Sequence, residues 1–206
     1  MLNEKGFDLW ADGYDKAVGL SEISDAYPFA GYKKVLNAIY QTVLEREAPT
    51  VLDIGFGTGT LTAKLYEKGC SIWGQDFSGK MLALAQPKMP EAQLFQGDFT
   101  QGLHPALQAR RYDFILSTYA LHHLTDAQKA PFIMELLARL NPGGQLLIGD
   151  VAFGSQEELE RCREQAGTGW DEDECYFVYE ALLPQFPGLQ FQPYSHCAGV
   201  LRLTGK

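Results

Sequence analysis

Basic residues are few in this chain of 206 residues. Lys and Arg number 17 against 26 Asp and Glu, which gives a formal net charge of −9, and no run of basic residues interrupts that pattern. At long range such a protein is repelled by phosphate backbones and by anionic lipid headgroups. We therefore expect no nucleic-acid partner and no membrane partner.

Cysteines and long apolar runs are scarce as well. The four cysteines form no Cys-x-x-Cys pair, and a chain of this length folds without a disulfide framework, so we expect reduced thiols. No apolar run approaches the ~18 residues that a membrane span needs. The first residues, MLNEKGFDLWADGYD, are charged where a signal peptide is apolar. The expected location is the cytoplasm.

Short apolar runs alternate with helical patterns along the chain. Apolar residues at steps of three and four predict a helix over 29–47. The predicted strands are 50–54, 71–75, 93–96, 112–117 and 145–149. Strands that alternate with helices favour a parallel sheet covered on both faces. Two later extended runs, 189–195 and 198–203, are predicted to pair antiparallel at one edge of that sheet.

Helix boundaries are marked by polar residues. Ser78 is a predicted N-cap, and capping boxes begin at Thr125 and at Ser155. The segment 141–144 (Asn-Pro-Gly-Gly) is predicted to end the helix that follows Thr125. The acidic cluster 171–174 is interpreted as a solvated loop or helix start.

A glycine-rich loop follows the first predicted strand, in the sequence Asp53-Ile-Gly55-Phe-Gly57-Thr-Gly59. Glycines at this place permit a tight turn and the close approach of a ligand, and the next helix begins with free backbone N–H groups. A dinucleotide site has the spacing G-x-G-x-x-G/A, which requires Gly or Ala where Thr60 stands. The alternating glycines after an acidic residue instead resemble motif I of the class I S-adenosylmethionine (SAM)-dependent methyltransferases.

Two further acidic residues follow strand ends. Asp76 ends the second strand, where a carboxylate can accept hydrogen bonds from both ribose hydroxyls. Asp98 follows the third strand. In the family that the loop resembles, an Asp here accepts from the adenine amino group, and the next backbone N–H, here that of Phe99, reaches a ring nitrogen.

Residues 7–150 together resemble a class I SAM-dependent methyltransferase. The segment 114–126 is most similar to the small bacterial UbiE-related enzymes of the YrrT type, and 7–15 is similar to their N-terminal cap. The resemblance implies an α/β fold, a Rossmann-like doubly wound sheet of seven strands in the order 3-2-1-4-5-7-6, with strand seven antiparallel. It implies one domain over 1–206, made of a helical cap (1–47), a cofactor-binding core (48–150), and C-terminal helices with an edge hairpin (151–206).

The implied function is transfer of a methyl group from SAM to a small-molecule acceptor, at O, N or C. One alternative is a SAM-binding protein without transfer activity, and another is an NAD-dependent oxidoreductase, against which Thr60 argues. The expected cofactor-binding residues are Tyr14, Asp53, Gly55, Gly57, Gly59, Asp76, Phe77, Asp98, Phe99 and Ser117. A monomer and a homodimer are both compatible with the sequence.

Methyl transfer is an in-line displacement that depends on a well-placed nucleophile, so it requires no fixed catalytic residue. His122 is a candidate general base, although packing within its loop explains it as well. Tyr14 is a candidate for closing over the methionine end of SAM, within a lid predicted over 1–30. No metal is expected, because His122 and His123 are adjacent and the spacing places no third ligand.

Overall fold

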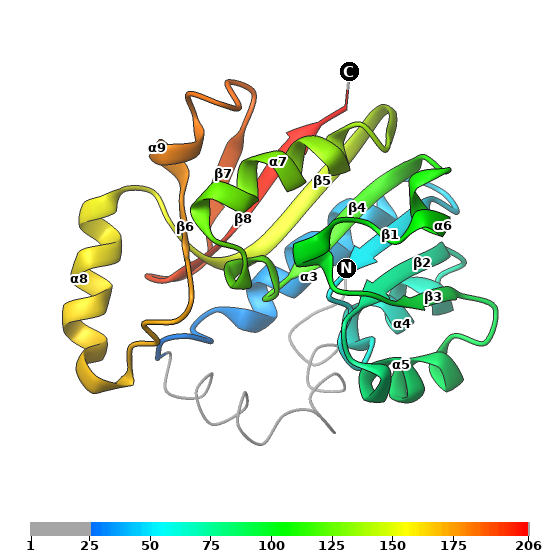
Figure 1. The fold of residues 1–206 in the computed structure, drawn as a ribbon, viewed down its shortest axis with the longest axis horizontal. Helices are drawn as coiled ribbons and strands as arrows, with labels where there is room; N and C mark the ends of the chain where they lie inside the picture. Colours follow the sequence, from blue (N-terminus) through cyan, green and yellow to red (C-terminus); the bar gives the residue numbers. More distant parts are fainter. Residues whose placement is uncertain (1–25, 206) are drawn as a thin grey trace.

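A computed structural model describes residues 26–205 of the protein, and their strands form one sheet (Figure 1). The strands are β1 (Thr50–Ile54), β2 (Ser71–Asp76), β3 (Gln93–Gln96), β4 (Tyr112–Thr118), β5 (Leu140–Phe153), β6 (Phe177–Val178), β7 (Gln190–Pro193) and β8 (Ala198–Thr204). The order is β3-β2-β1-β4-β5-β8-β7, with β8 antiparallel to both of its neighbours. This confirms the expected order and the edge hairpin. The short strand β6, which pairs with the end of β5, was not predicted.

One described α-helix precedes β1, and each of the others lies between two strands along the chain. The helices are α3 (Tyr32–Leu44), α4 (Thr60–Glu67), α5 (Gly79–Ala85), α6 (Pro105–Gln108), α7 (Asp126–Leu137), α8 (Gln156–Ala166) and α9 (Tyr179–Leu182). Ser78 caps α5 as predicted, by accepting from the backbone N–H of Met81 at 3.3 Å. Within residues 26–205, no helix has the length and apolar character of a membrane span.

The central strands are buried on both faces. Successive side chains of a strand point to opposite sides of the sheet. On β4, Ile115 packs in the core that includes α7, whereas Phe114 and Leu116 pack in the core that includes α3 and α4. Figure 1 shows α3 and α7 on opposite faces of the sheet. A parallel strand in this position needs a continuous apolar run, which the sequence of β4 has.

The start of β5 differs from the prediction. The helix α7 ends at Leu137, and strand pairing begins at Leu140, which lies opposite Tyr112. The segment 141–144 is therefore an irregular part of β5 and does not end the helix. The carboxylate of Asp113 explains this, because one of its oxygens accepts from the Asn141 side chain at 3.0 Å and the other from the backbone of Thr50 at 2.9 Å.

The predicted N-terminal cap (1–47) falls only in part within the described residues. Tyr14 and most of the predicted lid lie outside the described residues. The predicted helix over 29–47 is α3, which begins at Tyr32 after a turn over residues 27–31. That turn is attached to the C-terminal hairpin, because the Ser195 hydroxyl donates to the carbonyl of Ala30 at 2.7 Å.

The contact between α3 and β5 leaves no room for a side chain at Gly149. A Cβ there would lie 2.5 Å from Val35 Cγ1 and 2.8 Å from Ile39 Cδ1. We predict that Gly149→Ala lowers the free energy of unfolding by about 1–3 kcal/mol, as overpacking of a core does. In urea unfolding, the control Gly188→Ala should show no loss, because a Cβ there meets no described atom within 4 Å. Equal stability of the two variants would contradict this packing.

Candidate functional site

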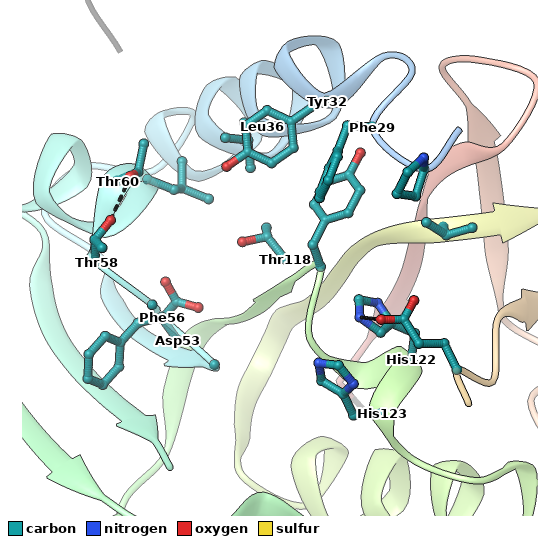
Figure 2. A pocket seen from close by; sticks show the side chains of 17 residues that line it. Phe29, Tyr32, Leu36, Asp53, Phe56, Thr58, Thr60, Thr118, His122 and His123 are labelled. Atoms are coloured by element: carbon teal, nitrogen blue, oxygen red, sulfur yellow. Dashed lines mark hydrogen bonds and ion pairs between the residues drawn. The ribbon is translucent and has the colours of Figure 1, made fainter. Parts of the chain in front are cut away.

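A cavity of about 280 Å³ lies at the carboxyl ends of β1 and β4. Its lining comes from the glycine loop after β1, from the first residues of α3 with the turn before it, and from the segment after β4. Figure 2 shows Asp53, Phe56 and Thr58 on one side of this cavity and His122 and His123 on the other. The strand order reverses between β1 and β4, and ligands of open α/β sheets bind at such a switch point.

The glycine loop is held close to the segment after β4. Gly55, Gly57 and Gly59 all have positive φ angles, of 72°, 55° and 74°. A Cβ at Gly55 would lie 2.5 Å from the Cβ of Ala120, so this glycine is required by space as well as by conformation. A Cβ at Gly57 would meet no described atom within 4 Å. The loop therefore presents bare backbone beside open space, as a ligand that approaches the main chain requires.

Asp53 is a buried carboxylate at the end of β1, with 1% of its surface exposed. One oxygen accepts a hydrogen bond from the Thr62 hydroxyl, and the other, Oδ1, has no partner among the described residues. Burial raises the pKa of Asp53 to about 7, and the nearby charge of Asp76 acts in the same direction, while the Thr62 hydrogen bond opposes them. A buried oxygen without a partner is costly, so a cationic ligand group is favoured beside it.

Asp76 connects the glycine loop to the start of α5. Its two oxygens accept from the backbone N–H groups of Gly57 at 2.8 Å and Ser78 at 2.9 Å. Each carboxylate oxygen has a second acceptor position, so these bonds leave capacity for ligand hydroxyls. The next side chain, Phe77, is 66% exposed beside this carboxylate.

Of the predicted cofactor residues in the described part of the chain, only Asp53, Gly55 and Gly57 line this cavity, and Gly59, Asp76, Phe77, Asp98, Phe99 and Ser117 do not. Asp98 is exposed and caps the turn Phe99–Gln101, by accepting from the Thr100 N–H at 2.9 Å. The side chain of Phe99 is buried in the core. Ser117 is fully buried and donates to the carbonyl of Ile54 at 2.8 Å, so it joins two strands, and Thr118 lines the cavity in its place.

His122 lies between two carboxylates. Its Nδ1 is 2.6 Å from Asp150 Oδ1, and its Nε2 is 3.4 Å from Glu174 Oε1. Asp150 has no exposed surface and also accepts from the Val151 N–H at 2.8 Å. Burial lowers the pKa of His122, but the attraction of Asp150 and Glu174 outweighs it, so the pKa is raised. The pKa of His123 is lowered, by burial and by the charge of His122.

Asp150 and Glu174 were not predicted as site residues. Asp150 could have been predicted from the sequence. It follows the apolar part of β5, which runs parallel to β4, so it lies at the edge of the sheet where β4 also ends. The interpretation of the acidic cluster as solvated agrees with the exposed residues 171–173 but is wrong for Glu174, which turns inward. The backbone N–H of Cys175 donates to the carbonyl of His122 at 2.9 Å and so places Glu174 there. No local signal in the sequence marks this contact.

The donor atoms of His122, His123 and Glu174 lie within 4.8 Å of one another. Residues of these types at such distances could hold a metal ion. The fold thus supplies the third ligand that the spacing did not. The two carboxylates beside His122 are equally well neutralised by a proton on its ring. We therefore treat this group as a proton site and assign no metal to it.

Three aromatic rings form a wall of the cavity near α3. The ring centroids of Phe29, Tyr32 and Tyr119 are separated by 4.9 to 6.0 Å. Figure 2 shows Phe29 and Tyr32 near each other in this wall. The described lining contains neither Lys nor Arg. The cavity thus combines an aromatic wall with the carboxylates of Asp53 and Glu174, and this combination suits neutral or cationic groups better than anions.

Comparisons with known proteins identify the family of this chain. Residues 51–144 match the methyltransferase domain family. An uncharacterized methyltransferase of Geobacillus kaustophilus is 37% identical over 161 residues, which are 78% of this chain and 72% of the relative. An uncharacterized methyltransferase of Anoxybacillus flavithermus is 37% identical over 154 residues, which are 75% of this chain and 69% of the relative.

Two solved structures show the shared fold. The magnesium protoporphyrin IX methyltransferase of Synechocystis, with bound S-adenosylhomocysteine (SAH), has a TM-score of 0.69 at 18% identity and covers 99% of this chain and 96% of its own. The N-methyltransferase NodS of Bradyrhizobium japonicum, in complex with SAH, has a TM-score of 0.64 at 16% identity and covers 98% of this chain and 97% of its own. Together with the matched domain and the curated relatives, this establishes that the chain belongs to the class I SAM-dependent methyltransferases.

Proposed function

We propose that this methyltransferase acts on a small acceptor bound in the cavity beside His122, and that the Asp150–His122 pair takes up the proton which the acceptor loses. The observation that carries the proposal is the buried 2.6 Å contact of Asp150 with His122, at a cavity bounded on its other side by the glycine loop. We also place the chain in the UbiE-related group of the YrrT type, on the resemblance of residues 114–126.

The glycine-loop side of the cavity suits SAM. When bound, SAM supplies a methyl group on a cationic sulfur, next to a methionine end that carries an ammonium group. Oδ1 of Asp53, which has no partner among the described residues, is suited to accept from that ammonium. The remaining acceptor positions of Asp76 suit the ribose hydroxyls. We assign the adenine to Asp98, the backbone N–H of Phe99 and the exposed ring of Phe77.

His122 is suited to act as a general base. Because a carboxylate can only accept, the Nδ1–H of His122 donates to Asp150, which leaves the lone pair of neutral His122 on Nε2. The proton of the acceptor's nucleophilic atom moves to Nε2 of His122. A lone pair of that acceptor atom forms the bond to the methyl carbon of SAM. The bond between this carbon and the sulfur breaks, so SAM leaves as a neutral thioether. Asp150 and Glu174 stabilise the imidazolium that results.

The cavity limits the acceptor. Its volume of about 280 Å³ must also hold the methionine end of SAM, which leaves space for a small molecule. The aromatic wall and the carboxylate of Glu174 favour a neutral or cationic acceptor with a proton on its nucleophilic atom. Oxygen and nitrogen nucleophiles both meet this description.

The proposed role of Asp53 makes SAM binding depend on pH. Because Asp53 has a pKa of about 7, it is largely protonated below pH 7 and then cannot pair with an ammonium group. The affinity for SAM should therefore rise between pH 5.5 and 7, by up to about tenfold per pH unit. Calorimetric titration of Asp53→Asn should show weaker binding without this rise.

The matched control is Glu91→Gln, which alters an exposed carboxylate away from the cavity and should bind SAM like the parent. NAD should not bind to any of these proteins. If Asp53→Asn shows the same pH dependence as the parent, the assignment of the ammonium to Asp53 is wrong.

The proposed role of His122 is tested by turnover. With SAM and a panel of small amines and hydroxyl compounds, the parent should release SAH with at least one acceptor. His122→Asn should then lower kcat by about 10²–10⁴-fold and leave SAM affinity unchanged, because it removes only the base. Since the base must be neutral, the parent rate should rise with pH through the raised pKa of His122.

His104→Asn is the control for this experiment, because His104 lies outside the cavity and stacks on Phe95. It should keep the parent kcat and the parent pH profile. The base assignment fails if His122→Asn turns over as fast as the His104 variant does.

A further inference from the structure

We propose that Cys162, His196 and Cys197 form a second site on this chain, which binds a soft divalent transition metal such as Zn²⁺. The Cys162 side chain comes from α8, and the other two come from the connection between β7 and β8. The three donor atoms lie within 4.8 Å of one another. The proposed methyl transfer uses none of these side chains, so the site is independent of it.

The donor set determines the class of ion. Two thiolates and one imidazole are the ligands that Zn²⁺ and related soft ions prefer, whereas Mg²⁺ and Ca²⁺ prefer oxygen. The two cysteines are distant in sequence and have no Cys-x-x-Cys spacing, so only the fold brings them together. Both thiols are buried, with 3% and 0% of the residue surface exposed.

The site has a route of approach. A second cavity, of about 420 Å³, is lined by Cys162 and His196 together with Ser195 and Glu158. His196 is exposed, so its ring can turn toward an ion without leaving a packed position. The cavity provides space for a water molecule as fourth ligand, which completes the tetrahedral coordination of Zn²⁺.

The backbone around the ligands is already fixed. The Ser195 hydroxyl accepts from the N–H groups of Cys197 at 3.2 Å and Ala198 at 3.0 Å, and it donates to the carbonyl of Ala30. A preorganised ligand such as Cys197 loses little entropy when the ion binds. A bound ion would join α8 to the hairpin of β7 and β8. The turn over residues 27–31 is attached to this hairpin, and it carries Phe29 of the aromatic wall.

The test is a titration of the reduced, chelator-treated protein with Co²⁺, followed by displacement with Zn²⁺. The parent should bind one equivalent of Co²⁺ with a thiolate-to-metal charge-transfer band in the near ultraviolet, and Zn²⁺ should abolish that band. Cys162→Ser and Cys197→Ser should each lose the band. His196→Ala should keep a band, because both thiolates remain, but its affinity for Co²⁺ should fall. The fall should exceed the roughly 10–100-fold that loss of an outer-shell partner causes, because His196 is a direct ligand.

Cys70→Ser is the matched control, because Cys70 is a buried cysteine outside this group and should leave the titration unchanged. If Cys197→Ser does not fold, the Cys162 and His196 variants decide the matter, since His196 is exposed. The proposal is overturned if the parent shows no charge-transfer band, or if Cys162→Ser shows the same band. Binding of Co²⁺ that lacks this band and is lost in Glu174→Gln would assign the metal to the histidine cluster and would equally refute the cysteine site.

Discussion

The pairing of β1 with β4 is the constraint on which the site depends. These strands are adjacent and parallel, but the chain leaves them toward opposite halves of the sheet, so their carboxyl ends border an open crevice. The glycine loop can lie beside the segment after β4 only because Gly55 has no Cβ to meet Ala120. The same edge receives Asp150 from β5, which pairs with β4. The cavity therefore follows from the strand order.

Buried carboxylates give this edge its chemical character. Asp53, Asp76 and Asp150 each have 4% exposure or less, and each carries at least one hydrogen bond from a hydroxyl, a backbone N–H or an imidazole. One oxygen of Asp53 and one of Asp150 have no partner among the described residues. Such oxygens favour positive charge nearby. A cationic cosubstrate on one side and an imidazolium on the other would supply it.

Much of the fold could be predicted from the sequence, and the failures have physical causes. The strands β1 and β3 have the predicted bounds, because β-branched or apolar runs between turn residues permit few other conformations. The Asn-Pro-Gly-Gly segment is typical of a turn, but the Asn141 side chain donates to Asp113, and this bond keeps the segment within β5. The position of Glu174 beside His122 and the proximity of Cys162 to Cys197 could not be predicted. Both depend on contacts between segments that are distant in sequence, and no local sequence pattern marks such contacts.

The ionisation of His122 decides whether the Asp150–His122 pair can act as the base. In ¹⁵N nuclear magnetic resonance of the imidazole rings, Nδ1 of His122 should stay protonated while Nε2 titrates, with a pKa above the ordinary histidine value. In Asp150→Asn the same pKa should fall, because burial then dominates. A His122 that titrates at Nδ1, or at the same pH in both proteins, would contradict the role of the Asp150–His122 pair.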